Sequence, residues 1–406
     1  MNKYGSIIFL NRTIQNLSIS ALSEISNVDI GLISRIERGQ LENSIKINAL
    51  LEALGIDINN VDKAIYETEM ALSIVLDRKI NVLDTKEYVD SINQKYLNNC
   101  PTIELLLINL MHMTVELDDV NKDEFDRLVY LFEKLKPIMG KRQLKIYYVF
   151  LGLHYSNEDH VDEAIKCFEL ARDITEGEVK LHAICLYYLG REYMSSRRNQ
   201  FSAILVTKEA IDLFEKEAIY VRIGDATLNI ANMAFNQKEY NKAEELYRKA
   251  IKIFEQFERR KNLIIKCISN IENIYVEQEQ YEKFLEEHEK LDEETKILME
   301  NGQVFITNLI FSLYKVNHYE ECTALLSTNR DKVKSVVLQK VLMYVEEKIA
   351  NKKNAYLHLK RAMSYMKREG YYGNAPFVLK LLINEFEEKG DYKNALLYSK
   401  MYIEII

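Results

Sequence analysis

The chain has 406 residues with 13 glycines and 3 prolines, and its formal net charge is −8. Glycine and proline together occur at only about a third of their usual frequency. Sheet-rich folds use these residues in turns, so the composition argues against such folds and predicts few tight turns. A hydrophobic content of 48% is enough for a core and argues against disorder. We therefore expect an all-α protein.

The sequence shows no signal for a membrane or a secretory pathway. No stretch approaches the ~18 consecutive apolar residues of a membrane span, and the N-terminus lacks the long apolar region of a signal peptide. The five cysteines are widely spaced, and none forms a C-x-x-C pair. We expect reduced, buried thiols and a cytoplasmic protein.

The first 56 residues read as four short helices, roughly at 5–16, 19–26, 30–38 and 44–54. Leu22 and Ile25 are expected to form the apolar face of the second helix. Asn27 follows at a turn, where asparagine tolerates a positive φ. The next helix carries the segment ISRIERG (33–39), and the last carries INALLEALGI (47–56). This pattern resembles the helix-turn-helix of the Xre/Cro/phage-repressor family.

The resemblance implies that the third helix reads DNA in the major groove while neighbouring cations hold the phosphates. The residues expected at base edges are Asp29, Ile30, Gly31 and Ser34. The expected phosphate contacts are Arg12, Arg35, Arg38 and Lys46. Ile19 departs from the family, which usually has a DNA-binding glutamine there.

Charge limits what this segment can do alone. Residues 1–58 contain five basic and six acidic groups, so the segment is nearly neutral. We expect weak DNA binding per domain, with specificity from a dimer on two half-sites. The alternative is that Arg35 and Arg38 lie on a solvated helix face with Glu37 as a partner.

Residues 59–145 also read as helices but match no repeat well. Pro101 and Pro137 mark breaks in this stretch. We interpret it as a helical linker with degenerate repeats.

From residue 146 the chain repeats itself. The segment that begins at Tyr148 places Gly152, Ala164, Phe168 and Ala171 at the spacing of the tetratricopeptide pattern. Equivalent anchors recur at 164, 203, 243, 284, 322, 355 and 395. We expect seven helix pairs in a tetratricopeptide-like, right-handed α-solenoid over 146–406. A generic helical bundle is the alternative.

Asparagines recur in phase on the expected inner face of this array. Asn229, Asn270 and Asn308 share one phase, and Asn232 and Asn273 share the next. An amide offers a donor and an acceptor, so such a ladder can bind the backbone of an extended peptide. The alternative is that these side chains serve helix packing.

Three further residues complete the predicted peptide site. Tyr187 and Phe311 are expected to line side-chain pockets, and Arg191 is expected to bind a carboxylate.

A helix-turn-helix followed by ~40-residue helical repeats resembles the RRNPP group of peptide-pheromone receptors. The resemblance implies a cytoplasmic homodimer that binds operator DNA through residues 1–58. It also implies that residues 146–406 bind a short signalling peptide and dimerise, and that bound peptide alters how the DNA-binding pair is presented.

No catalytic or metal-binding constellation is apparent. The seven histidines are scattered, and neither H-E-x-x-H nor a phosphate-binding glycine loop occurs. We therefore expect no enzymatic activity and no cofactor. Two alternatives stay open: an adaptor that acts only by protein–protein contact, and a response-regulator phosphatase or inhibitor like the Rap proteins. The resemblance to the latter implies a three-helix bundle at the N-terminus, which residues 18–54 do not suggest.

Overall fold

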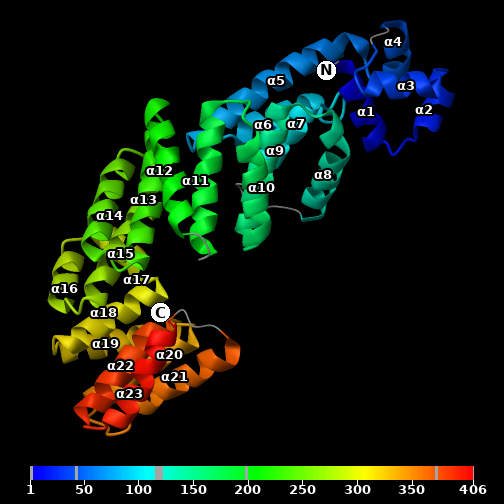
Figure 1. Cartoon of the computed structure of the whole chain (residues 1–406). Helices are drawn as coiled ribbons and strands as arrows, with labels where there is room; N and C mark the ends of the chain where they lie inside the picture. Colours follow the sequence, from blue (N-terminus) through cyan, green and yellow to red (C-terminus); the bar gives the residue numbers. More distant parts are fainter. Residues whose placement is uncertain (1–2, 42–43, 115–121, 197–199, 371–373, 406) are drawn as a thin grey trace. The chain divides into compact units, whose positions relative to one another are not determined.

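The computed structural model describes residues 3–41, 44–114, 122–196, 200–370 and 374–405. Within these ranges all regular structure is helical, with α-helices labelled α1 to α23 (Figure 1). The chain divides into two compact units, residues 1–237 and 238–406. The predicted all-α fold is confirmed, and the predicted array is shared between the two units.

A small helical bundle begins unit 1. It contains α1 (Lys3–Ile14), α2 (Ile19–Ser26), α3 (Ile30–Glu37) and α4 (Ser44–Ala53), and the long α5 (Ile58–Ile80) follows. Leu22, Ile33 and Leu50 are fully buried in its core. Ile25 is 58% exposed, so the expectation that it belongs to the apolar face of the second helix is wrong.

The predicted breaks in the linker region are confirmed. Pro101 lies between α6 (Lys86–Tyr96) and α7 (Ile103–Met113). Pro137 lies in the 3-10 helix η2 (Lys136–Ile138), which follows α8 (Lys122–Leu135). A proline cannot donate the main-chain hydrogen bond that a helix interior needs, so each helix ends before it.

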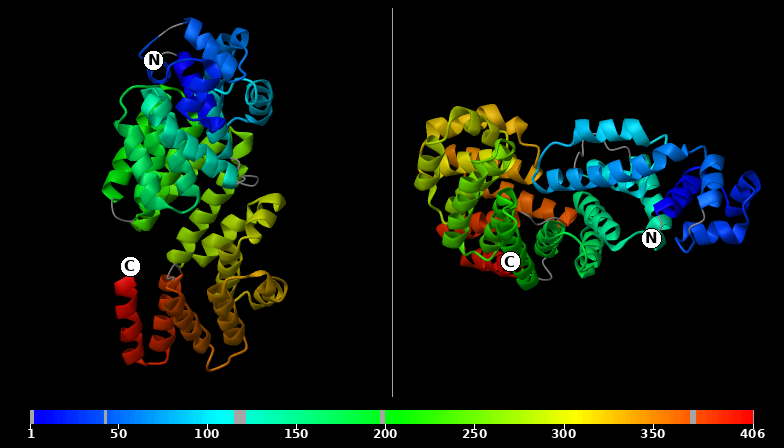
Figure 2. Two further views of the ribbon diagram at one scale, coloured as in Figure 1. Left: turned by 90° about the vertical axis from the view of Figure 1, so that its right-hand side faces the viewer. Right: turned by 90° about the horizontal axis from the view of Figure 1, so that it is seen from above.

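The helices of the seven predicted pairs are present in order along the chain, and the boundary between the two units falls inside the third pair (Figure 1 and Figure 2). Within each unit, neighbouring helices pack against one another. Every predicted anchor is buried, from Ala164 in the first pair to Ala395 in the last. A further helix, α17 (Glu293–Glu300), lies between the fourth and fifth pairs. The pairs are α9 (Lys141–Asn157) with α10 (Val161–Asp173), α11 (Val179–Ser195) with α12 (Gln200–Lys216), α13 (Tyr220–Asn236) with α14 (Tyr240–Phe254), α15 (Lys261–Glu277) with α16 (Tyr281–Glu289), α18 (Gln303–Lys315) with α19 (Tyr319–Asn329), α20 (Val336–Ile349) with α21 (Tyr356–Glu369), and α22 (Ala375–Glu388) with α23 (Tyr392–Ile405).

The turns inside the pairs correct the expectation of few tight turns. Several are only three residues long, and the middle residue has a left-handed backbone. Only one of these middle residues is glycine, Gly390; others are Asp159, Lys238, Glu279 and Asn317, with φ between 59° and 63°. Such residues bear a small conformational cost that the packing of the flanking helices offsets. The chain therefore makes tight turns without glycine.

Glycine is instead used where helices approach closely. A methyl group built on Gly152 would lie 2.9 Å from Phe168 Cε1, and one on Gly190 would lie 2.2 Å from Thr207 Oγ1. The absence of a side chain at Gly152 therefore lets the first two helices of the array approach closely.

Candidate functional site

The turn between α2 and α3 has the predicted geometry. Asn27 ends α2 with φ 53° and ψ 38°. Asp29 caps α3, and its Oδ1 accepts from the main-chain nitrogens of Gly31 (2.8 Å) and Leu32 (3.1 Å). A cap of this kind fixes the start of a helix. The Asp29 carboxylate is thereby engaged within the chain, which favours a structural role over the predicted contact with a base.

One face of α3 is open to solvent. Ile30 is 50% exposed, and Gly31, Arg35 and Arg38 are also exposed. Arg38 folds back along its own helix, with Nη2 2.5 Å from Ser34 Oγ and Nε 3.1 Å from Ser34 O. The predicted base-reading and phosphate-binding residues of α3 therefore share a surface, and that surface mixes apolar groups with two cations.

Arg12 lies inside the bundle. Its Nε is 2.6 Å from Glu37 Oε1, its Nη2 is 3.0 Å from Glu37 Oε2, and its Nη1 donates to Leu17 O at 2.8 Å. The side chain of Glu37 is only 4% exposed. We therefore revise the assignment of Arg12 to a phosphate, because its donors are used within the chain. Glu37 is also not the partner of Arg35 and Arg38. Lys46 is half-buried on α4.

In unit 1 the predicted peptide-site residues lie on α11 and α13. Tyr187 is buried, with its ring 5.0 Å from that of Tyr188. Burial, with a contribution from the charge of Asp225, raises the pKa of the Tyr187 hydroxyl. Arg191 Nε donates to Glu192 Oε1 at 3.0 Å, and Arg191 Nη2 lies 2.5 Å from Ser156 Oγ. The predicted carboxylate-binding residue thus already has an internal carboxylate partner.

Two asparagines of α13 were also predicted to bind peptide. Asn229 is 6% exposed, and no acceptor in the described part of the chain reaches its buried Nδ2. Asn232 is half-buried. A buried amide group without an acceptor is costly, so Asn229 is a good candidate to bind a carbonyl group brought by a ligand.

In unit 2 the structure brings two predicted asparagines together. Asn308 Nδ2 donates to Asn273 Oδ1 at 2.6 Å, which joins α18 to α15. Asn270 is hydrogen-bonded to the hydroxyl of Tyr247 on α14. Phe311 is 1% exposed and packs edge-on against Phe377 at 5.2 Å. We revise the assignments of Phe311 and Asn270, because the first is a core residue and the second is used in helix packing.

The sequence analysis missed several buried charged groups in the array, among them Arg222 and Glu272. Arg222 is 9% exposed and pairs with Asp225, three residues later on α13. Glu272 on α15 is 1% exposed, and its Oε1 lies 3.8 Å from His288 Nδ1 on α16. Burial raises the pKa of Glu272, and His288 offsets only part of this rise. The signal in the sequence that could have revealed these residues is a charged residue at a position where the repeat pattern expects an apolar one.

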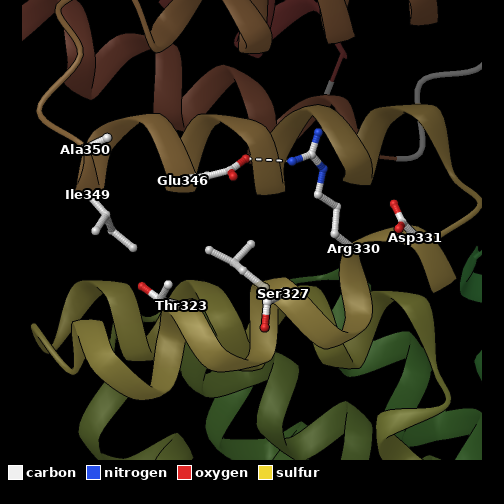
Figure 3. Close-up of a pocket in the computed structure, with 8 residues that line it drawn as sticks. Thr323, Ser327, Arg330, Asp331, Glu346, Ile349 and Ala350 are labelled. Atoms are coloured by element: carbon white, nitrogen blue, oxygen red, sulfur yellow. Dashed lines mark hydrogen bonds and ion pairs between the residues drawn. The ribbon is translucent and has the colours of Figure 1, made fainter.

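A pocket of about 420 Å³ lies between α19 and α20 (Figure 3). Thr323 and Ser327 of α19 line it, and an ion pair spans it, with Arg330 Nη1 2.9 Å from Glu346 Oε2. Arg330 and Glu346 neutralise each other, and the carboxylate of Asp331 is the remaining charged group in the lining.

Two features are absent from the described residues. No helix there is both long and apolar enough to cross a membrane. No group of three or more histidine, cysteine, aspartate or glutamate side chains there could hold a metal ion.

Comparison with known proteins identifies the fold. The family model of the soluble NSF attachment protein matches residues 148–300, where the repeat pattern is clearest. No curated protein matches the sequence. Among solved structures, the apo form of the quorum sensor NprR from B. thuringiensis superposes with a TM-score of 0.65 at 16% identity, over 84% of this chain and 98% of that one. The chain therefore shares the fold of NprR.

Rap proteins are about as similar. The apo form of RapI gives a TM-score of 0.62 at 15% identity, over 84% of this chain and 96% of that one. A Rap protein complexed with competence and sporulation factor gives 0.61 at 13% identity, over 85% of this chain and 98% of that one. At these identities the likeness establishes a tetratricopeptide-like array, as predicted, and no more.

Proposed function

We propose that this chain is a regulator of transcription that binds operator DNA through α3 and responds to a short signalling peptide bound by its repeats. The observation that carries the proposal is the combination of two parts in one chain. A short capped helix exposes Arg35 and Arg38 in the N-terminal bundle, and the array has the fold of a quorum sensor.

The DNA-binding half of the proposal depends on the exposed face of α3. Its N-terminal residues are held by the Asp29 cap, which leaves Ile30 and Gly31 free to approach the floor of a groove. Arg35 and Arg38 lie about one and two turns further on, where phosphates would pass. With only two exposed cations on this face, we expect weak binding by one copy and useful affinity from a homodimer on two half-sites.

The peptide-binding half depends on the amide of Asn229, which is buried, and on those of Asn273 and Asn308, which are half-buried. Asn229 has an unsatisfied donor, and Asn273 and Asn308 satisfy each other only in part, since each amide offers further donors and acceptors. The neighbours support this half, because one is a quorum sensor and another is a Rap protein in complex with competence and sporulation factor.

An electrophoretic shift experiment tests DNA binding. Fragments from upstream of the gene are the probes, and R35A/R38A is compared with K208A/K249A, which removes the same charge from exposed sites in the array. We expect binding to be lost only in the first variant, with dimerisation unchanged in both. Equal shifts by both variants would contradict the assignment of α3.

A second candidate function is supported by the apolar part of the same surface. Ile25 and Ile30 are each at least half exposed, which is unusual for a DNA-reading face and suits a protein partner. Rap proteins, which share the array, are almost as similar in fold as NprR. If I25S/I30S abolishes capture of a response-regulator receiver domain while no DNA shift is seen in the parent, the protein–protein function replaces the first.

A further inference from the structure

The long helix α5 is tied to the starts of α9, α11 and α13, which are the first helices of three successive pairs. Arg142 at the start of α9 donates to Ser73 Oγ at 3.0 Å. Lys180 at the start of α11 donates to Asp77 Oδ1 at 2.8 Å. Arg222 at the start of α13 donates to Ile80 O at 2.8 Å. The three cations recur at the period of the repeats, and their partners follow one another along α5.

Arg222 differs from the other two cations because it is buried. Its Nη2 donates to Lys79 O at 2.9 Å, so the guanidinium binds two of the last carbonyl groups of α5. These carbonyl groups lie at the C-terminal end of α5, where a cation is favourable, and Lys79 O also accepts from the main-chain nitrogen of Val82 at 3.2 Å. A buried guanidinium must keep its hydrogen bonds, because each donor left unpaired costs the full penalty of its desolvation.

The remaining bond of Arg222 points toward the candidate ligand site. Its Nη1 is 2.9 Å from Asp225 Oδ2. Asp225 lies one turn before Asn229 on α13, and its charge contributes to the raised pKa of Tyr187. One guanidinium therefore connects the end of α5 with the residues that are the best candidates to meet a ligand in unit 1.

We propose that Arg222 is a positioning residue that couples the region around Asp225 and Asn229 to the docking of α5, and through α5 to the N-terminal bundle. The proposal rests on the proposed function only in taking this region as the ligand site. A polar ligand that binds Asp225 competes for the third bond of Arg222. The geometry at Lys79 and Ile80 then changes, because the three bonds share one rigid planar group. The ligand can shift α5 from the docked to the altered arrangement only to the extent that it binds one arrangement more tightly than the other.

Hydrogen exchange of the full-length protein tests the coupling without peptide or DNA. The readout is the exchange rate of the amides at residues 76–83, which include the last turn of α5. R222M removes all three hydrogen bonds of the guanidinium. D225N weakens only the bond from Arg222 Nη1 to residue 225 and leaves the two bonds to α5 in place. K180M is the matched control, because it removes a cation that ties α5 to the array but has no link to Asp225.

We expect exchange at 76–83 to become faster by about tenfold or more in R222M and by severalfold in D225N, and to change little in K180M. Unchanged exchange in D225N beside faster exchange in R222M would overturn the proposal, because Arg222 would then be only a cap. If R222M does not fold, D225N against K180M still decides the matter. The exchange rate at residues 76–83 does not depend on whether the protein binds DNA, which R35A/R38A tests separately. Failure of the proposed function can therefore be distinguished from failure of the coupling.

Discussion

Gly190 on α11 and Thr207 on α12 face each other across a close contact between the two helices. A methyl group on Gly190 would lie 2.2 Å from Thr207 Oγ1 and 3.2 Å from the main-chain oxygen of Ala203. Thr207 is itself fully buried, and its hydroxyl donates to Ala203 O at 2.7 Å. Neither neighbour can move without breaking a buried hydrogen bond, so the absence of a side chain at 190 sets the spacing of this helix pair.

Substitution of this glycine is predicted to destabilise unit 1. We expect G190A to lower the free energy of unfolding by about 1–3 kcal/mol, the usual cost of overpacking. Urea unfolding followed by circular dichroism measures it. The control K208A changes an exposed residue of the same helix pair, and we expect it to stay within about 0.5 kcal/mol of the parent. Equal stabilities of G190A and K208A would show that the helices can separate freely.

The ion pair between Arg12 and Glu37 gives a second prediction. Both side chains are largely buried, and two hydrogen bonds join the guanidinium to the carboxylate. The variant R12M therefore leaves the Glu37 carboxylate unpaired in the bundle. We expect a loss of about 3–5 kcal/mol, and expect R12M/E37L to recover most of it, because a buried pair can be replaced by apolar groups. Hydrogen exchange of α1 and α3 measures the local stability. A double variant that exchanges as fast as R12M would contradict this account.

Two buried glutamates predict opposite responses to pH. Burial alone would raise the pKa of Glu385, but hydrogen bonds from Lys348, Tyr344 and Lys389 outweigh it and lower the pKa. The folded state therefore binds this proton less readily than the unfolded state, and the stability that Glu385 contributes is lost as the pH falls through the acidic range. We expect E385Q to be less stable than the parent at pH 7, with the difference shrinking at low pH.

The pKa of Glu272 is shifted the other way, mainly by burial. Its proton is held more tightly in the folded state, so its contribution to stability is lost as the pH rises above the ordinary carboxyl range. We expect E272Q to be more stable than the parent at pH 7, with the gain disappearing under acidic conditions. Urea unfolding of the parent, E272Q and E385Q between pH 4 and 8 measures both effects. If both substitutions changed the free energy of unfolding at pH 7 in the same direction, the opposite pKa shifts assigned to Glu272 and Glu385 would be refuted.

Asn229 predicts a separation of binding from stability. Its Nδ2 has no acceptor in the described part of the chain, so N229A loses no hydrogen bond of that group. We expect its free energy of unfolding to stay within about 1 kcal/mol of the parent. The affinity for a cognate peptide should fall tenfold or more, if the amide binds a peptide carbonyl with the energy of a buried hydrogen bond. Calorimetry with synthetic peptides encoded beside the gene measures it, and unchanged affinity would remove Asn229 from the site.

The repeat pattern predicted the array well because its signal is local. Small residues at Ala164, Ala203 and Ala243 recur wherever one helix packs on the next, and each of them is fully buried. The turn at Asn27 was predictable for the same reason, since a positive φ restricts the choice of residue at a single position.

Composition predicted the helical fold but misjudged its turns. Scarcity of glycine suggested few tight turns, yet Asp159, Lys238, Glu279 and Asn317 adopt the left-handed backbone. The cost at each turn is small, whereas the two helices that it joins bury a large apolar surface, so helix packing decides the backbone there.

The sequence by itself determined the helical class, the number and order of the helix pairs, and the residues that let them approach, because these follow from spacing along one chain. Only the tertiary structure decided which polar side chains are engaged. Arg12 is bound to Glu37, Asn308 to Asn273, and Arg222 to the end of a helix more than 140 residues earlier. Such partners meet through packing between distant segments, and a periodic pattern that places a side chain on a face carries no information about what lies opposite it.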